Sequence, residues 1–316
     1  MLAPLDYAID VQLKSVLIAT DFSAASEKAL RHALAIARSS HAKLYLMHVV
    51  SSPGLNIAGP EAVAQSTTRS LRDLMLLERG LIADGSLRDM RYQALVYDGD
   101  IWSELQRVIG RERIDLVVVG THGRGGFKKL MLGSVAEQIF RNSRCPVLTV
   151  GRCSPPEPQM LPSGAPQPLL FPTDFSEASV RALPYAILFA EKRSTKLVLL
   201  HMLSLAPLVE DGLWYTQAAV EEMKNEARAT ARRHLRDWVA RFNFKIEPTF
   251  VAEFGEPAEG ILEVVSAIHA EAIVMGLPHT AHVKVKSHLP RSTAYDVVCG
   301  AICPVLTVRA DAGLAS

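Results

Sequence analysis

The sequence repeats one succession of segments after about 155 residues. The segment SVLIATDFSAASEKALRHALAIA, which starts at Ser15, resembles PLLFPTDFSEASVRALPYAILFA, which starts at Pro168. Both copies end on the identical CPVLTV, which starts at Cys145 and at Cys303. The period is far longer than the roughly 20–50 residues of stacked repeat arrays. The pattern therefore indicates a tandem duplication of one domain.

A proline-rich segment separates the two copies. Residues 151–167 read GRCSPPEPQMLPSGAPQ, with five prolines and two glycines. Proline lacks a backbone donor, so such a run favours an extended linker over a strand or helix. We therefore expect a first domain at 1–150, a linker at 151–167 and a second domain at 168–316. Two domains also suit a chain of 316 residues.

Short apolar runs alternate with helical patterns in each copy. Continuous runs such as LVVV indicate a parallel sheet covered on both faces. Both copies are therefore predicted to be doubly wound, flavodoxin-like (HUP-type) α/β domains with five parallel strands and helices on both faces. In the first copy we expect strands near 15–20, 43–50, 91–97, 114–119 and 146–150, and helices near 24–39, 61–84, 100–112 and 134–143.

Ligands of open α/β sheets bind beyond the carboxyl ends of the strands, where the winding reverses. We assume that the fourth strand lies beside the first, which brings Asp21 and Gly120 to one rim. Asp21 then has two interpretations. It caps the helix that starts near Ser23, as Asp, Ser and Thr commonly do, or its carboxylate or a nearby amide pairs with the edge of a purine.

A glycine-rich stretch, GTHGRGGFKKLMLGS, follows the fourth predicted strand. Glycines accept a positive φ and allow close backbone approach, so successive amides can form an anion nest. Arg124, Lys128 and Lys129 add positive charge. Ser134 and Glu137 match a capping box, which is compatible with an anion-binding helix start at the same place. The stretch matches neither common phosphate-loop pattern. The residues themselves therefore predict a site for a phosphate-sized anion; its glycines are Gly120, Gly123, Gly125, Gly126 and Gly133.

The spacing Gly120-x2-Gly123-x9-Gly133-Ser134 resembles the ATP-binding signature of the universal stress proteins. The resemblance extends over nearly the whole chain, as two fused domains. It includes the Thr-Asp-Phe-Ser turn, the His-Val-Val after the second strand and the closing Cys-Pro-Val strand.

This resemblance implies an adenine nucleotide, ATP or else ADP or AMP, and allows for an accompanying Mg²⁺. The implied contacts lie at strand ends and a helix start: Ala19, Thr20 and Asp21 at adenine and ribose, Val49 on the base, Val119, Gly120, His122 and Gly123 along ribose and phosphates, and Gly133, Ser134 and Val135 at the phosphate tail.

The second copy departs from this pattern. Gly276 and Ser292 remain, but His279 replaces the second glycine and Arg291 stands where Gly133 stands. Added side chains obstruct a positive φ and close phosphate approach. We expect nucleotide in the first domain and weak or no nucleotide in the second. Three histidines crowd the altered loop, yet their spacing matches no strong metal pattern, so no metal site is expected; they are His279, His282 and His288.

The predicted function is that of an ATP-binding regulatory or stress-response protein. Two alternatives remain open: a slow ATPase or phosphotransfer enzyme using His122, and a scaffold without nucleotide. Without a Walker-type lysine or a recognisable base, any enzyme would be at most a weak ATPase, and no catalytic residue is assigned. The resemblance also implies that the two domains pair through their last strands, 146–150 and 304–308, and a further homodimer is possible.

Charge and cysteine content limit which partners and which cellular compartment are expected. A formal net charge of +1 gives no global attraction to nucleic acid or membranes, so neither is expected as a partner. Four cysteines are too few for a disulfide scaffold, and the N-terminus does not resemble a signal peptide. These features favour a cytoplasmic protein.

Overall fold

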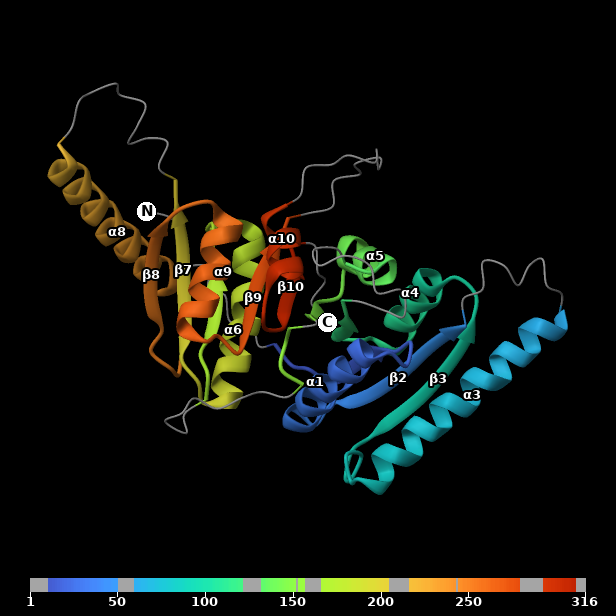
Figure 1. Cartoon of the computed structure of the whole chain (residues 1–316). Helices are drawn as coiled ribbons and strands as arrows, with labels where there is room; N and C mark the ends of the chain where they lie inside the picture. Colours follow the sequence, from blue (N-terminus) through green and yellow to red (C-terminus); the bar gives the residue numbers. More distant parts are fainter. Residues whose placement is uncertain are drawn as a thin grey trace. The chain divides into compact units, whose positions relative to one another are not determined.

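The computed structural model describes residues 11–50, 60–121, 132–151, 153–156, 166–204, 216–242, 244–278 and 292–310. The chain divides into two compact units, whose main parts are Gln12–Pro158, called here the front unit, and Gln159–Asp311, called the rear unit. Each unit is described separately below. Figure 1 colours them from blue to green and from yellow to red.

The front unit alternates strands and helices, as the sequence predicts. Its five strands are parallel and lie in the order β3-β2-β1-β4-β5. The elements are β1 (Ser15–Ala19), α1 (Ala24–Ser40), β2 (Lys43–Val50), α3 (Pro60–Ala83), β3 (Tyr92–Asp98), α4 (Ile101–Glu112), β4 (Leu116–Gly120), α5 (Ser134–Asn142) and β5 (Val147–Val150).

The rear unit follows the same plan, which confirms two doubly wound α/β domains in tandem. Its parallel strands lie in the order β8-β7-β6-β9-β10. The elements are β6 (Leu169–Pro172), α6 (Glu177–Arg193), β7 (Leu197–Leu203), α8 (Gln217–Val239), β8 (Thr249–Phe254), α9 (Pro257–Ile268), β9 (Ala272–Leu277), α10 (Thr293–Gly300) and β10 (Val305–Arg309).

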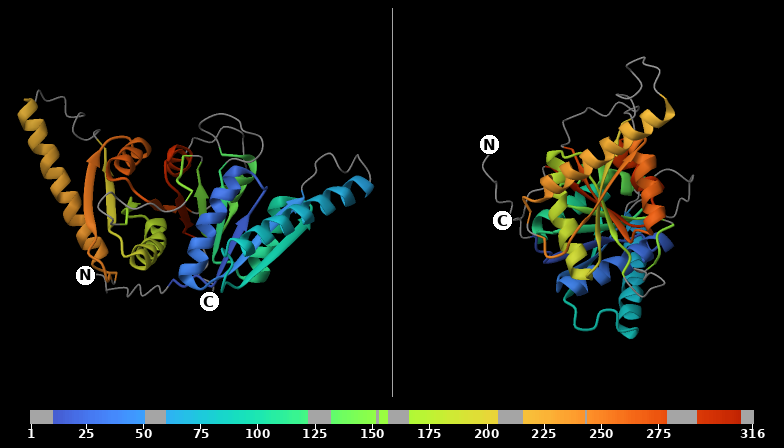
Figure 2. Two further views of the ribbon diagram at one scale, coloured as in Figure 1. Left: turned by 60° about the horizontal axis from the view of Figure 1, so that its bottom comes forward. Right: turned by 90° about the vertical axis from the view of Figure 1, so that its left-hand side faces the viewer.

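Helices cover both faces of each sheet. In the front unit α1 and α3 pack on one face, and α4 and α5 lie on the other. In the rear unit one face is covered by α6 and α8 and the other by α9 and α10. Figure 2 shows the same layers from two further directions. Strand β1 is apolar after Ser15, and Val16, Leu17 and Ile18 are fully buried. Burial on both faces is why these strands read as continuous apolar runs.

The winding of each sheet reverses beside its first strand. Leu17 of β1 pairs with Tyr45 of β2 on one side and with Val117 of β4 on the other. The neighbour relation that places Asp21 and Gly120 at one rim is therefore present. In the described part of the chain, no helix is long and apolar enough to cross a membrane.

Candidate functional site

The turn between β1 and α1 is built from short polar side chains. The hydroxyl of Thr20 accepts a hydrogen bond from the amide of Phe22 (3.0 Å), and the Asp21 carboxylate accepts one from the amide of Ser23 (3.0 Å). Ser23 is the N-cap of α1, and its hydroxyl accepts from the amide of Ser26 (3.3 Å). These bonds hold Phe22 at a φ of +61°. The turn is thus rigidly specified by its own sequence.

Asp21 remains ionised at neutral pH. Burial raises the pKa of this carboxyl, but hydrogen bonds from Ser23 and Ser26 outweigh it, so the pKa lies below its ordinary value of 3.8. Asp21 is not the helix cap, which is Ser23. An ionised carboxylate only accepts hydrogen bonds, so Asp21 is an acceptor within this turn.

A histidine of β2 supports the same turn. Nδ1 of His48 lies 2.7 Å from the carbonyl oxygen of Thr20, and its ring packs 4.6 Å from the ring of Phe22. A carbonyl only accepts, so Nδ1 carries the proton and donates. The predicted residue Val49 follows and is half-buried. The sequence analysis missed His48 as a positioning residue, although the repeat carries His201 at the matching place.

Gly120 ends β4 and touches the start of α1. A Cβ atom on Gly120 would lie 2.8 Å from the carbonyl carbon and oxygen of Ala25, closer than real contacts allow. Of the two properties of glycine considered above, Gly120 uses close backbone approach and not a positive φ, because the positive-φ glycines of the described chain are Gly85, Gly99 and Gly255. Glycine is required here for close packing of strand and helix.

Helix α5 begins at this same edge. Gly133 is its N-cap, with a φ of −61° and no hydrogen bond from a capping side chain. The positive φ expected at Gly133 is therefore wrong. The capping box is also wrong: Ser134 is the first helical residue and is exposed, while the carboxylate of Glu137 accepts from Arg141 (2.8 Å). The first amides of α5 thus have no side-chain cap.

Several predicted residues do meet at the carboxyl edge of the front sheet. Ala19 ends β1 and Thr20 follows it, and Val119 and Gly120 end the neighbouring β4. The amide of Gly133 donates to the carbonyl of Thr121 (2.7 Å), which ties the start of α5 to the end of β4. Ser134 and Val135 follow directly, whereas His122 and Gly123 lie outside the described residues.

The rear unit repeats the turn but not the helix start. Asp174 accepts from the amide of Ser176 (3.0 Å), and Nδ1 of His201 donates to the carbonyl of Thr173 (2.8 Å). At α10, however, Ser292 is the N-cap, and its own hydroxyl accepts from the amide of Tyr295 (3.2 Å). Rear helix α10 is therefore capped by its own side chain.

The two units also differ in the size of one side chain at the end of their second strands. Met202 occupies the place that Val49 has in the front unit. Its methyl group packs against Gly260, the fourth residue of α9. The longer side chain of Met202 therefore contacts α9 in the rear unit.

The described residues contain no group of three or more His, Cys, Asp or Glu side chains arranged to hold a metal. The histidines of the altered rear loop, His279, His282 and His288, lie outside the described residues.

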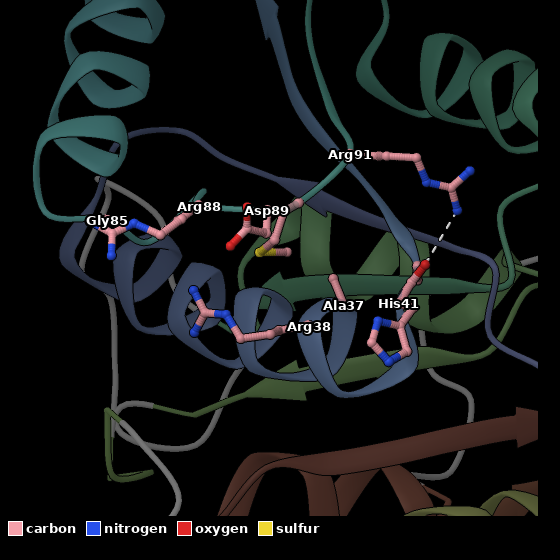
Figure 3. A pocket seen from close by; sticks show the side chains of 9 residues that line it. Ala37, Arg38, His41, Gly85, Arg88, Asp89 and Arg91 are labelled. Atoms are coloured by element: carbon pink, nitrogen blue, oxygen red, sulfur yellow. Dashed lines mark hydrogen bonds between the residues drawn. The ribbon is translucent and has the colours of Figure 1, made fainter.

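A cavity of about 790 Å³ lies at the opposite, amino edge of the front sheet (Figure 3). Arg38 in its wall donates to the carbonyl of Ser86 (2.6 Å), and Arg91 donates to the carbonyl of His41 (3.3 Å). Cations near a helix C-terminus complement its dipole, and Arg38 lies in the last turn of α1. These contacts give the arginines a structural role, away from the predicted site.

Known proteins match both halves of the chain. The profile of the "Universal stress protein family" matches residues 12–151 and 166–309. "Universal stress protein MJ0531" of Methanocaldococcus jannaschii is 31% identical over 144 residues, covering 43% of this chain and 81% of that protein.

A solved structure that aligns with nearly the whole chain shares the fold. A universal stress protein from Archaeoglobus fulgidus aligns with 96% of this chain and 100% of its own, with a TM-score of 0.67 and 21% identity. A universal stress protein crystallised in complex with cAMP aligns with 43% of this chain and 95% of its own, with a TM-score of 0.31 and 23% identity.

Proposed function

Because the chain belongs to the universal stress protein family, we propose that its front unit binds an adenine nucleotide and acts as a nucleotide-dependent regulatory protein. The site is the carboxyl edge of the front sheet, between the β1–α1 turn and the start of α5. ATP, ADP and AMP share the chemistry that this edge accommodates.

One observation carries the proposal: helix α5 starts at this edge on a glycine without a capping side chain. The first amides of a helix carry a partial positive charge and bind anions such as phosphate. Ser134 is exposed beside them and adds a hydroxyl donor. The phosphate tail would therefore lie at Gly133, Ser134 and Val135.

The turn after β1 suits the base and ribose. Asp21 presents an ionised acceptor, and Val49 offers half-buried apolar surface on the neighbouring strand. Purines combine an apolar face with polar edges, so this pairing of side chains fits them. Mg²⁺ would be held chiefly by the nucleotide phosphates and water, as is common for this ion.

The rear unit is proposed to bind nucleotide weakly or not at all. Ser292 already caps α10, so a phosphate would have to displace this hydrogen bond. Met202, at the place of Val49, also puts a longer side chain at the end of the second strand. The enzymatic alternative depends on His122, which lies outside the described residues, so the proposal remains one of binding and regulation.

Identification of the molecules that purified full-length protein releases on heating tests the proposal. We expect adenine nucleotide at about one per chain, in keeping with one nucleotide site in the front unit. Protein that neither releases nucleotide nor binds added ATP in equilibrium dialysis would contradict the proposal and favour the scaffold alternative.

A matched pair of variants tests the site itself. Gly133→Asp places a carboxylate at the N-cap, where it both caps α5 and repels phosphate. We expect ATP affinity to fall about tenfold or more, which corresponds to about 1.4 kcal/mol. Gly133→Ala is the control, because a φ of −61° is open to alanine and alanine supplies no cap. Equal ATP affinity of the two variants would argue against this site.

A further inference from the structure

The chain that follows β5 lies against helix α1. Residues 153–156, called here the strap, belong to the predicted linker, yet they lie within the front unit. The ammonium of Lys28 donates to the carbonyl of Ser154 (3.2 Å), and Nε2 of His32 lies 3.0 Å from the carbonyl oxygen of Pro155. A carbonyl only accepts, so Nε2 carries the proton and donates. Two side chains from successive turns of α1 therefore hold the strap.

Hydrogen bonds of the strap itself close it into a turn. The amide of Gly151 donates to the hydroxyl of Ser154 (3.1 Å), and the amide of Ser154 donates to the carbonyl of Gly151 (3.2 Å). Ser154 is polar but only 1% exposed. Pro155 and Pro156 follow, and their fixed φ lowers the entropy that the chain loses when it is held. The strap is thus specified by its own sequence.

The rear unit shows that the fold does not require this arrangement. Tyr185 of α6 occupies the place that His32 has in α1. His32 is 7% exposed, and buried ring nitrogens are normally hydrogen-bonded. The carbonyl of Pro155 is the partner of Nε2. The strap therefore explains a histidine at this position, which the packing of the helix on its sheet does not.

The start of the strap is tied to the proposed phosphate position. Val150, the last residue of β5, precedes the strap, and its carbonyl accepts from the amide of Thr121 (3.0 Å). The carbonyl of Thr121 accepts in turn from the amide of Gly133 (2.7 Å), the N-cap of α5. Thr121 is buried, so water does not compete for these bonds. Two hydrogen bonds therefore connect the start of α5 to the end of β5.

The clasp of the strap is tied to the proposed base and ribose position. The two clasping side chains lie in α1, which begins after the N-cap Ser23, in the turn that holds Asp21. A nucleotide that spans from this turn to the start of α5 contacts both elements to which the strap is attached. A ligand stabilises the arrangement that it binds over the others. Bound nucleotide would therefore restrain both attachments of the strap.

We propose that the strap is a regulatory element whose clasped state is coupled to nucleotide binding in the front unit. The inference rests on the proposed nucleotide site. Bound nucleotide favours the clasped strap, and loss of nucleotide favours its release from Lys28 and His32. Occupancy of the site thus controls how much of the chain after β5 the front unit holds. Such coupling is reciprocal, so release of the strap lowers nucleotide affinity by the factor by which nucleotide opposes release.

Hydrogen exchange at the strap, measured on the full chain with and without ATP, tests the coupling. The amides of Gly151 and Ser154 donate within this turn and exchange when it opens. We expect saturating ATP to slow their exchange about fivefold or more, a usual size for coupling between sites. ATP binding without a change at these amides would overturn the inference and leave the proposed function intact. A chain that binds no ATP would contradict both.

Removal of the clasp tests the reciprocal effect. Lys28→Met with His32→Phe removes both donors but keeps the length of one side chain and the ring of the other. We expect faster exchange at the two strap amides and an ATP affinity lower by about fivefold or more in equilibrium dialysis. Arg181→Met with Tyr185→Phe is the matched control at the equivalent places of α6 and should change neither quantity.

Ser154→Ala is a second variant that leaves α1 untouched, because it removes only the hydroxyl to which the amide of Gly151 donates. It should also speed exchange at Gly151 and weaken ATP binding, and circular dichroism checks that the variant is folded. Variants that open the strap but bind ATP as tightly as the unmodified chain would contradict the coupling. An equal loss of ATP affinity in the α6 control would contradict its assignment to the strap.

Discussion

Among the described residues, the helix starts of the front and rear units differ although the turns after their first strands are nearly the same. Helix α5 begins on Gly133 without a side-chain cap, whereas α10 begins on Ser292, whose hydroxyl caps it. The turns after β1 and β6 are by contrast nearly the same, with Asp21 and Asp174 in equivalent hydrogen bonds. Features that both units share are therefore best explained by the fold. The uncapped start of α5, which the rear unit lacks, is the feature that supports nucleotide binding in the front unit.

This comparison shows which glycines are explained by packing alone and which bear on nucleotide binding. Gly120 and Gly276 each lie against the backbone of the first helix of their unit, at Ala25 and Ala178. Both glycines are thus explained by packing, whether or not a nucleotide binds. Gly133 has no such counterpart, because Arg291 stands at its place in the rear sequence.

The largest expected loss of stability concerns the glycine at the end of β4 and of β9, which both units share. Gly120→Ala and Gly276→Ala should each destabilise their own unit by about 1–3 kcal/mol, because the added methyl group overlaps helix backbone. Urea unfolding followed by circular dichroism measures this. A stability unchanged by either substitution would show that the strand and helix can separate without cost, contrary to the packing explanation.

Acid should affect the two turns alike. The folded-state pKa of Asp21 and of Asp174 lies below the ordinary 3.8, since hydrogen bonds from their serines outweigh burial, which acts to raise each pKa. Their contribution to stability is therefore present above about pH 4 and is lost as the pH falls through the lowered pKa values.

Asp21→Asn and Asp174→Asn should each reduce the loss of folding stability in acid. Urea unfolding midpoints at neutral pH and near pH 3 measure this loss. If only one of the two variants flattens the pH dependence, the turns are not equivalent in the way described.

The smallest expected effect separates the helix starts. Ser292→Ala should cost about 0.5–2 kcal/mol, as is typical for loss of an N-cap. Ser134→Ala should change stability by less than about 0.5 kcal/mol, because Ser134 is an exposed first-turn residue without a capping role. Thermal unfolding of both variants decides the point, and equal losses would show that α5 and α10 are capped alike.

Much of the fold could be predicted from the sequence. The apolar runs and the repeat predicted every strand and helix of the front unit to within about two residues, because continuous burial and helical periodicity are local signals. The Thr-Asp-Phe-Ser turn was also identifiable from its residues.

The details of the site were harder to predict. A shift of one residue in the helix start turned Ser134 from an expected cap into a first-turn residue. The role of Gly120 depends on how closely α1 crosses β4, and the role of Met202 depends on a glycine in a distant helix. Such contacts are set by tertiary packing and cannot be predicted from the spacing of residues in the sequence.

Hydrogen exchange of the full chain with and without ATP tests the central claim most directly. The account predicts that ATP slows amide exchange at residues 134–136, at the start of α5, and leaves residues 293–295 of α10 unchanged. Protection of the α10 amides with no change at α5 would contradict it.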